Sequence, residues 1–232
     1  MRDHLALLPF LVAKFPRWLD HFVDHGPFTR HDQLACHVKA IALRRKHTSV
    51  VAASEDPAFA EALYDTLRAW GVGSRGSILV PWAEFGPRLR FVSTTLQPLE
   101  ALSIDADDLD VQSSIESLWS AIESIGVVRN KAPLVAGSKT LHHLLPDLVP
   151  PMDRAYTQTF FGWHAPQFQN DQAQRFKLAY KALASVARRV RAAEYVGTHS
   201  WHSSVSKVLD NALVGLVCAI QDGSALKLLN EA

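Results

Sequence analysis

The sequence predicts a mainly α-helical fold, and three observations carry this prediction. Apolar residues recur at intervals of three and four along most of the 232 residues, which is the spacing of one helix face. Proline, aspartate or serine precedes several of these stretches, and glycine ends several of them. Only residues 48–53 leave room for a strand. We therefore expect a helical, two-lobed globular protein with at most a small β element.

In the N-terminal half, the pattern predicts helices over residues 4–24, 31–46, 57–70, 82–90 and 96–103. Gly26-Pro27 ends the first of these helices, and Asp56-Pro57 starts the third with proline at its first position. Gly71 stops that third helix. The stretch from Thr48 to Ala53 is expected to be a short strand or a loop.

In the C-terminal half, the pattern predicts helices from residue 110 or 113 to 125, and over 138–145, 152–161, 170–194 and 204–221. Gly126 ends the first of these. The acidic connection from Asp105 to Asp110 is the best candidate for a boundary within the chain. We expect one globular domain over residues 1–232, with helical lobes over 1–104 and 111–232.

Composition excludes several classes of protein. The formal net charge is +1, so any basic surface for a nucleic acid must be local. Cys36 and Cys218 are the only cysteines, which excludes a disulfide framework and a four-cysteine cluster and favours a reducing cytoplasm. Lys14 and Arg17 follow the first apolar run in helical rhythm, so we interpret it as a core helix rather than a signal peptide. No apolar run reaches the length that is needed to span a membrane. We expect no cofactor.

The most informative segment begins at Gly137. Gly137-Ser138 predicts a helix N-cap, in which Ser138 accepts a hydrogen bond from a backbone N–H. Lys139 would then lie in the first turn, where the positive end of the helix dipole disfavours its ammonium form. Partial burial would lower its pKa in the same direction. A lysine that attacks an aldehyde or sugar carbon needs such a lowered pKa. We interpret Lys139 as a candidate nucleophile.

Two histidines and an aspartate accompany this lysine. His142 and His143 follow Lys139 at i+3 and i+4 and are expected to share its face. Pro150-Pro151 forces an extended corner, and Asp153 falls at the opening of the next helix. There its carboxylate would act as an acid–base group or simply cap the helix. A structural ion pair between Lys139 and Asp153 is the alternative interpretation.

These residues also carry a family resemblance. Gly137-Ser138-Lys139-Thr140, followed by Pro151-Met152-Asp153-Arg154-Ala155-Tyr156, resembles the helix-hairpin-helix DNA glycosylase superfamily, whose hairpin reads Leu-Pro-Gly-Val-Gly-x-Lys-Thr-Ala. In that superfamily a catalytic aspartate opens a later helix. The segment also resembles the pattern Ser-Lys-x-Leu-His-x-Leu-x-Pro-x-Leu-x-Pro-x-x-Asp of a family of bacterial proteins without an established activity.

The resemblance implies an all-helical, two-lobed protein that binds double-stranded DNA across the hairpin. It would make Lys139 the Schiff-base nucleophile and Asp153 the carboxylate that assists departure of a flipped base. Leu134 and Val135 stand where the hairpin has proline and glycine, which favours a catalytically silent nucleic-acid-binding module as an alternative. A helical protein-interaction scaffold is the third interpretation.

Two further stretches bear on nucleic-acid binding. A basic stripe on the helix 170–194 would suit a phosphate backbone, although a solvated helix face gives the same pattern. Trp201 and His202 are expected either to reach the Lys139–Asp153 cleft, with Trp201 stacking on a base, or to be structural. The candidate nucleic-acid-binding residues are Gly137, Ser138, His142, His143, Arg154, Tyr156, Lys177, Lys181, Arg188, Trp201 and His202.

The remaining expectations concern metals and pairing. His142, His143, His199 and His202 could gather around zinc, but adjacent histidines on one helix do not easily chelate together, so no metal site is expected. Lys207 and Asp210, at i and i+3, are expected to pair. The polar pair Asp210-Asn211 is expected to tie down a neighbouring loop.

Overall fold

A computed structural model describes residues 5–28, 30–73, 78–129 and 133–230 of the chain. The helices are α1 Leu8–Ala13, α2 Phe15–His25, α3 His31–Lys46, α4 Val50–Glu55, α5 Pro57–Ala69, α6 Trp82–Leu96, α7 Val111–Ile125, α8 Pro133–Leu144, α9 Thr157–Phe160, α10 Ala165–Asn170, α11 Gln172–Val190, α12 Val205–Gln221 and α13 Ala225–Asn230, with 3-10 turns at Gln97–Leu99 and Ala192–Tyr195. The fold is mainly α, as predicted. Over the described ranges, the β structure is an isolated antiparallel bridge between Leu79 and Val128.

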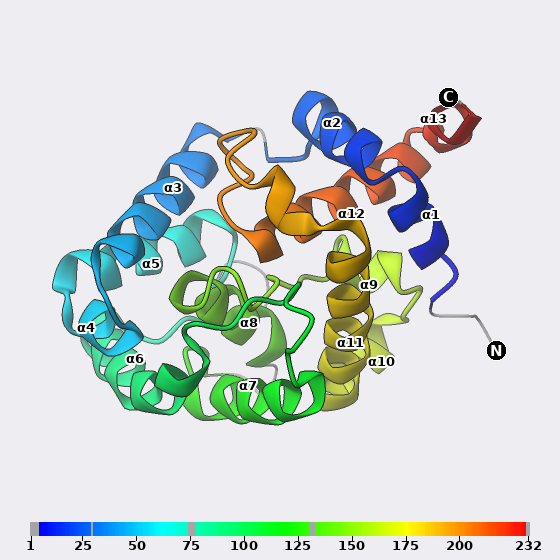
Figure 1. The fold of residues 1–232 in the computed structure, drawn as a ribbon. Coiled ribbons are helices and arrows are strands. Elements are labelled where there is room, and N and C mark those ends of the chain that lie inside the picture. Colours follow the sequence, from blue (N-terminus) through cyan, green and yellow to red (C-terminus); the bar gives the residue numbers. More distant parts are fainter. Residues whose placement is uncertain (1–4, 29, 74–77, 130–132, 231–232) are drawn as a thin grey trace.

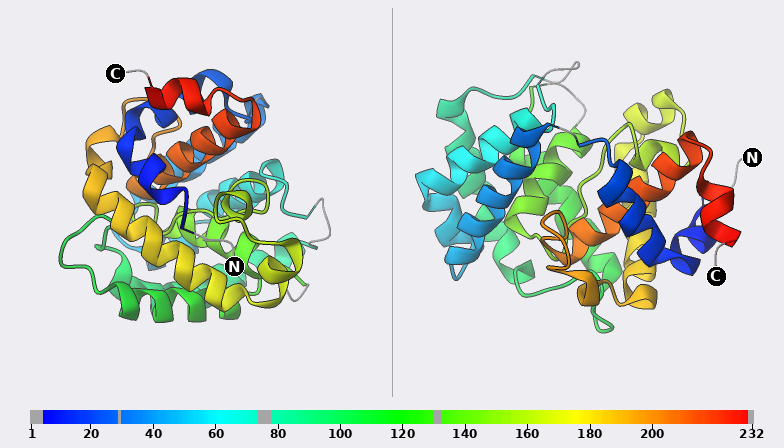
Figure 2. Two further views of the ribbon diagram at one scale, coloured as in Figure 1. Left: turned by 90° about the vertical axis from the view of Figure 1, so that its right-hand side faces the viewer. Right: turned by 90° about the horizontal axis from the view of Figure 1, so that it is seen from above.

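The helices form two groups around α8. Figures 1 and 2 show α3 to α7 on one side and α1, α2, α12 and α13 on the other, with α8 between them. Helix α12 packs along α2, so the first helices of the chain join the last ones. Most buried apolar side chains between Leu11 and Ala219 belong to one continuous core, and Phe22, Trp201 and Val214 form a smaller second cluster. A division into lobes over 1–104 and 111–232 remains a prediction.

Several helix ends follow from local sequence. The side chain of Asp56 accepts a hydrogen bond from Ala58 N and caps α5, whose first residue is Pro57. Asp110 caps α7 in the same way through Ser113 N. Gly126 ends α7 in the left-handed conformation, at φ 54°, which glycine adopts without steric cost. These three boundaries confirm the sequence prediction.

Other boundaries differ from the prediction. Residues 50–55 form helix α4 rather than a strand or loop, because the Ser49 side chain accepts from Ala52 N and caps the helix. Helix α8 starts at Pro133, so Ser138 lies inside the helix and is not its N-cap. The predicted helix 152–161 is confined to Thr157–Phe160, because residues 150–153 form an extended corner.

Two predicted segments divide further, and a third is longer than predicted. Residues 4–24 contain α1 and α2, separated at Lys14. Residues 170–194 contain α11 and a 3-10 turn, separated by Arg191 in the left-handed conformation. Helix α6 extends to Leu96, beyond the predicted end at 90. Across the described chain, no helix combines the length and apolar character that crossing a membrane requires.

Candidate functional site

Helix α8 is held close to its neighbours where the candidate lysine lies. A Cβ atom added to Gly137 would stand 2.8 Å from Ile122 Cγ2, so glycine permits the close approach of α7. The buried Ser138 hydroxyl accepts a hydrogen bond from Met152 N at 3.1 Å. This bond joins the Pro150-Pro151 corner to α8. The corner therefore brings Asp153 to the same region as Lys139.

Lys139 lies in a largely apolar environment. Its side-chain ammonium group donates a hydrogen bond to the backbone oxygen of Trp70 at 3.3 Å and stands 5.7 Å from the centre of a Trp70 ring. Burial lowers the pKa of Lys139, while Asp153 and Asp210 oppose the shift by attraction and Lys207 adds to it by repulsion. The lowered pKa agrees with the sequence-based expectation. Of the two causes expected there, burial is present, whereas the helix N-terminus is not, because α8 begins at Pro133.

Asp153 caps the turn that leads into α9. Its Oδ1 accepts hydrogen bonds from Tyr156 N at 2.7 Å and from Thr157 N at 3.4 Å. Its own N–H donates to Thr157 Oγ1 at 3.0 Å. The capping role that the sequence suggested is therefore present. Because these bonds engage Oδ1, Oδ2 is the oxygen that remains for other contacts.

Lys139 and Asp153 line one small cavity. The other lining residues are Phe28, Trp70, Pro151, Lys207 and Asp210. The cavity volume is about 80 Å³, which is room for about two or three waters at about 30 Å³ each. Among the described residues, no carboxylate lies within the 4.0 Å ion-pair distance of the Lys139 ammonium group. Lys139 and Asp153 therefore face one space without forming a direct ion pair.

The second lysine of the cavity has a different environment. Lys207 Nζ donates to Asp210 Oδ2 at 2.6 Å and to Asn211 Oδ1 at 2.7 Å, which confirms the predicted pair. Asn211 Nδ2 donates to Trp201 O and so ties down the loop before α12, as expected. Burial raises the pKa of the Asp210 carboxyl, and Lys207 opposes that shift. The Lys207 ammonium group also lies over aromatic rings, with Nζ at 5.2–5.6 Å from ring centres of Phe22, Phe28, Trp70 and Trp201.

The two adjacent histidines of α8 do not line this cavity. His142 and His143 are completely buried and lie beside His37 of α3. Burial lowers the pKa of His143 to about 4 and takes the pKa values of His37 and His142 well below their usual range. The three imidazoles are therefore neutral at pH 7.

The candidate nucleic-acid contacts do not form one surface around the cavity. Lys177 and Lys181 are exposed on α11. Arg188 instead donates hydrogen bonds to the backbone oxygens of Ala106 and Leu109 and so anchors the segment that precedes α7. Arg154 is exposed next to Asp153.

The aromatic candidates are mostly enclosed. Trp201 is 7% exposed and packs against Phe28, so it supports the cavity wall rather than presenting a free stacking face. Tyr156 also contacts Phe28 and is half-buried. His202 is buried, and its Nδ1 lies 2.8 Å from Thr198 Oγ1.

Sequence reasoning missed Trp70, Phe28 and His37. Trp70 was identified only as the last apolar residue of its helix, yet it provides both a carbonyl and a ring to Lys139. His37 follows Leu34 and precedes Ile41 on the inward face of α3, and this helical spacing is the signal that could have found it.

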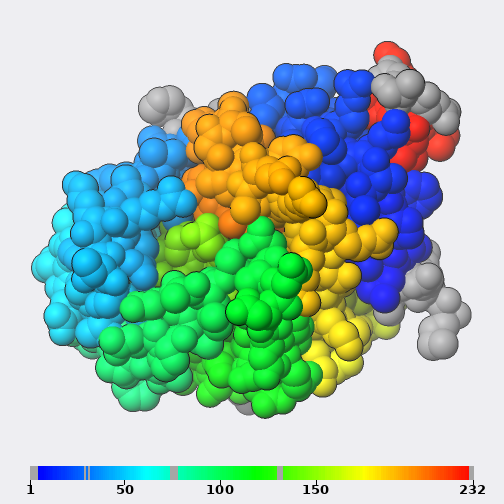
Figure 3. All heavy atoms as spheres, viewed as in Figure 1, coloured from blue at the N-terminus to red at the C-terminus, as the bar shows by residue number. Residues whose placement is uncertain are grey.

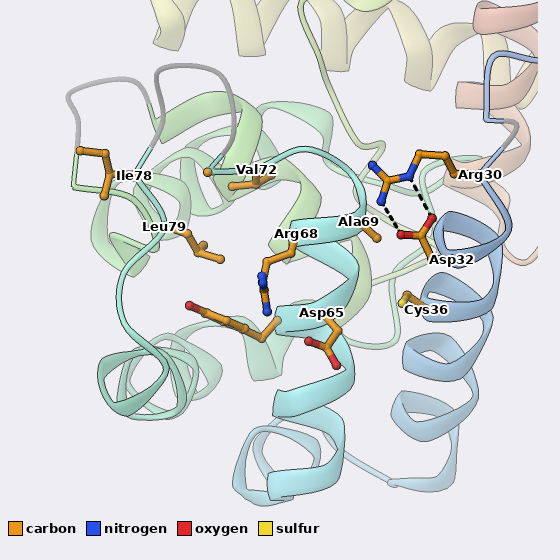
Figure 4. A pocket seen from close by; sticks show the side chains of 11 residues that line it. Arg30, Asp32, Cys36, Asp65, Arg68, Ala69, Val72, Ile78 and Leu79 are labelled. Atoms are coloured by element: carbon orange, nitrogen blue, oxygen red, sulfur yellow. Dashed lines mark hydrogen bonds and ion pairs between the residues drawn. The ribbon is translucent and has the colours of Figure 1, made fainter.

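A larger and more open cavity lies between α3 and α5. Figure 4 shows Asp65 and Arg68 of α5 opposite Cys36 and the ion pair of Arg30 with Asp32. Its volume is about 640 Å³, and it contains none of the candidate site residues. Burial, together with Asp65 and Asp32, raises the pKa of the Cys36 thiol, which disfavours the reactive thiolate.

The candidate site is compact and enclosed. Figure 3 shows the face on which the light-green part of the chain around α8 is visible only in a recess between the parts coloured light blue, orange and green. Comparison of the chain with protein-family models, curated proteins and solved structures gives no match. The chemistry of the cavity residues therefore carries the functional argument.

Proposed function

We propose that the chain is a DNA-glycosylase-like nucleic-acid-binding protein in which Lys139 acts as an amine nucleophile and Asp153 as the assisting carboxylate. The observation that carries this proposal is a buried lysine with a lowered pKa that faces an aspartate across a small cavity. Such a lysine supplies more neutral amine at pH 7 than a solvated one. The resemblance of the surrounding segment to helix-hairpin-helix glycosylases adds DNA as the substrate class.

The cavity size favours a small electrophile. A volume of about 80 Å³ accepts an aldehyde or the edge of a sugar, whereas a whole nucleobase would require the wall at Phe28 to open. The aldehyde of an abasic site fits this limit best. The abasic-site lyase reaction is therefore the first activity to test, and base excision is the second.

The reaction would proceed through an imine. The neutral Lys139 amine adds to the aldehyde carbon C1′, and loss of water gives a protonated imine. A base then removes a proton from C2′, and the 3′ phosphate leaves with its bonding electrons, which breaks the strand. Asp153 would hold a proton during the loss of water and stabilise the positive charge of the imine. Borohydride reduces this imine to a stable secondary amine.

One observation favours the silent nucleic-acid-binding module instead. The Oδ1 of Asp153 is engaged by two backbone N–H groups, which is sufficient to explain the residue as a helix cap. Exposed Lys177 and Lys181 on α11 would then provide phosphate contacts without chemistry.

The deciding experiment is borohydride trapping on duplex DNA that carries one abasic site. We compare wild type with Lys139→Gln and Asp153→Asn, and Lys39→Gln serves as a control at an exposed lysine of α3 outside the proposed site. The proposal expects a covalent adduct in wild type and in the control, none in Lys139→Gln, and about a hundredfold slower formation in Asp153→Asn. Circular dichroism verifies that each variant is folded.

The other outcomes separate the alternatives. Retention of DNA in a gel-shift assay without an adduct, with affinity that falls steeply with salt, would support the silent module. Neither adduct nor retention would overturn both nucleic-acid interpretations and leave the interaction scaffold.

A further inference from the structure

We propose that His37, His142 and His143 form a buried binding site for one divalent transition-metal ion, with Zn²⁺ as the best-matched ion. One nitrogen of each residue lies within 4.8 Å of the corresponding nitrogens of the other two. The sequence predicted no metal site, because the adjacent His142 and His143 seemed unable to chelate together. The third histidine comes from α3, and both histidines of α8 turn toward it.

The hydrogen bonds of the α8 histidines leave their Nε2 atoms as acceptors. His142 Nδ1 lies 3.0 Å from both the backbone oxygen of Val149 and the Ser206 hydroxyl, and His143 Nδ1 lies 2.8 Å from the backbone oxygen of Lys139. The Ser206 hydroxyl donates its proton to Pro146 O at 2.6 Å, so toward His142 it acts as an acceptor. A carbonyl oxygen can only accept, so both Nδ1 atoms carry the proton. The lone pairs of both rings are therefore on Nε2, where a metal would bind.

His37 completes this arrangement. Its Nδ1 lies 3.0 Å from His143 Nε2, and its Nε2 lies 2.7 Å from the hydroxyl of Ser203. With a metal bound, His37 would carry its proton on Nε2 and donate it to Ser203 Oγ. Every ligand would then have an oxygen partner on its other nitrogen, which is the usual outer-shell pattern of histidine metal sites.

A second observation points to a ligand at this place. His142 Nε2 is buried and has no hydrogen-bond partner among the described residues. Without a metal, His37 Nδ1–H donates a hydrogen bond to His143 Nε2. The lone pair on His142 Nε2 then has no hydrogen-bond donor among the described residues. An unpaired buried acceptor carries a free-energy cost that a metal ion would remove.

The geometry requires only a local adjustment. Zn–N bonds of about 2.0–2.1 Å at tetrahedral angles place ligand nitrogens about 3.3 Å apart. The 3.0 Å separation of His37 and His143 is already near that value. Three imidazoles match Zn²⁺ and its neighbours in the first transition row better than Mg²⁺ or Ca²⁺, which prefer oxygen ligands.

The test measures metal binding directly. Because the histidines are completely buried, the protein is unfolded and refolded either with Zn²⁺ or with a chelator, and bound metal is counted after gel filtration. The proposal expects one Zn²⁺ per chain and a thermal midpoint several degrees higher in the metal-loaded protein. Refolding with Co²⁺ should give the visible absorption bands of a tetrahedral site made of three imidazole nitrogens and one water.

Two matched variants locate the ion. His142→Asn keeps a side-chain N–H near Val149 O but removes Nε2, so it should abolish the Zn²⁺ shift. His21→Asn is the control, since His21 is also buried but contacts His25 and Asp222 rather than the three histidines of the proposed site. Loss of the shift in His21→Asn alone would overturn the proposal.

The wild-type protein keeps the test decisive even if His142→Asn does not fold. Wild type that retains no Zn²⁺, shows no change in its midpoint and gives no Co²⁺ bands would identify the histidines as a hydrogen-bonded core network, and the proposal would be wrong. Tetrahedral Co²⁺ bands in wild type that persist in His21→Asn would support it without the His142 variant.

Discussion

Lys139 and Lys207 line the same cavity, but only Lys207 has a carboxylate partner among the described residues. Lys207 Nζ lies 2.6 Å from Asp210 Oδ2, whereas the Lys139 ammonium group donates to the backbone oxygen of Trp70 at 3.3 Å. The Lys207–Asp210 pair predicted from the sequence is present, whereas the alternative prediction of a direct ion pair between Lys139 and Asp153 finds no such contact among the described residues. Under the proposed function, Lys139 is therefore the amine that we expect to react.

The two lysines should differ in what they contribute to stability. Lys207→Met leaves the buried Asp210 carboxylate without its counter-ion and should lower the free energy of unfolding by about 3 kcal/mol. Lys139→Met removes only a hydrogen bond to the Trp70 carbonyl and should lower the free energy of unfolding by about 1 kcal/mol or less. Urea unfolding at pH 7 measures both. The double variant Lys207→Met/Asp210→Asn should recover most of the loss, and no recovery would contradict the ion-pair assignment.

Two glycines should tolerate alanine differently. A Cβ on Gly215 would lie 1.9 Å from the backbone oxygen of Trp18, where α12 crosses α2, so Gly215→Ala should cost about 3 kcal/mol or more. A Cβ on Gly137 would meet the Ile122 side chain at 2.8 Å, which can move, and the better helix propensity of alanine offsets part of the strain. Gly137→Ala should therefore cost about 1 kcal/mol. Equal losses in thermal unfolding would contradict this packing description.

The pH dependence of stability should contain a contribution from His202. Burial, with repulsion from His199 and Lys207, lowers its pKa from 6.5 to about 4. As pH falls, the unfolded chain takes up this proton first, so the stability present above pH 6.5 is lost progressively down to pH 4. The loss is on the order of 3 kcal/mol in total. His202→Asn should flatten the curve of unfolding free energy against pH by that amount, whereas a parallel curve would contradict the lowered pKa.

The sequence correctly predicted those helices whose ends contain a capping side chain or a terminal glycine. Helix α12 at 205–221, the Asp56 cap and the Asp110–Gly126 helix all have a capping side chain or a terminal glycine. Ser49 is an equally good cap, but the β-branched residues after it made residues 50–53 resemble a strand. Together with the Ser49 cap, packing of α4 against α6 stabilises the helical conformation of residues 50–55. This tertiary contact cannot be recognised in the local sequence pattern.

The site was predictable only within one segment. Lys139, Asp153 and the adjacent histidines lie close together in the sequence, so their spacing indicated a common site. Trp70 and His37 reach the same region from α5 and α3, at sequence separations of 69 and 106 residues. Nothing in the sequence near Lys139 specifies these partners. The partners of Lys139 outside its own segment, and the third histidine, therefore required the fold.

The measurement that tests the central claim most directly is the titration of the Lys139 side chain by heteronuclear NMR, with its signal assigned through Lys139→Gln. It needs no nucleic acid and no assumption about the reaction. Burial without a carboxylate in ion-pair contact predicts that Lys139 titrates below 10.5. A Lys139 pKa at or above 10.5 would mean that the ammonium form is stabilised in the cavity, and it would contradict the assignment of Lys139 as a nucleophile.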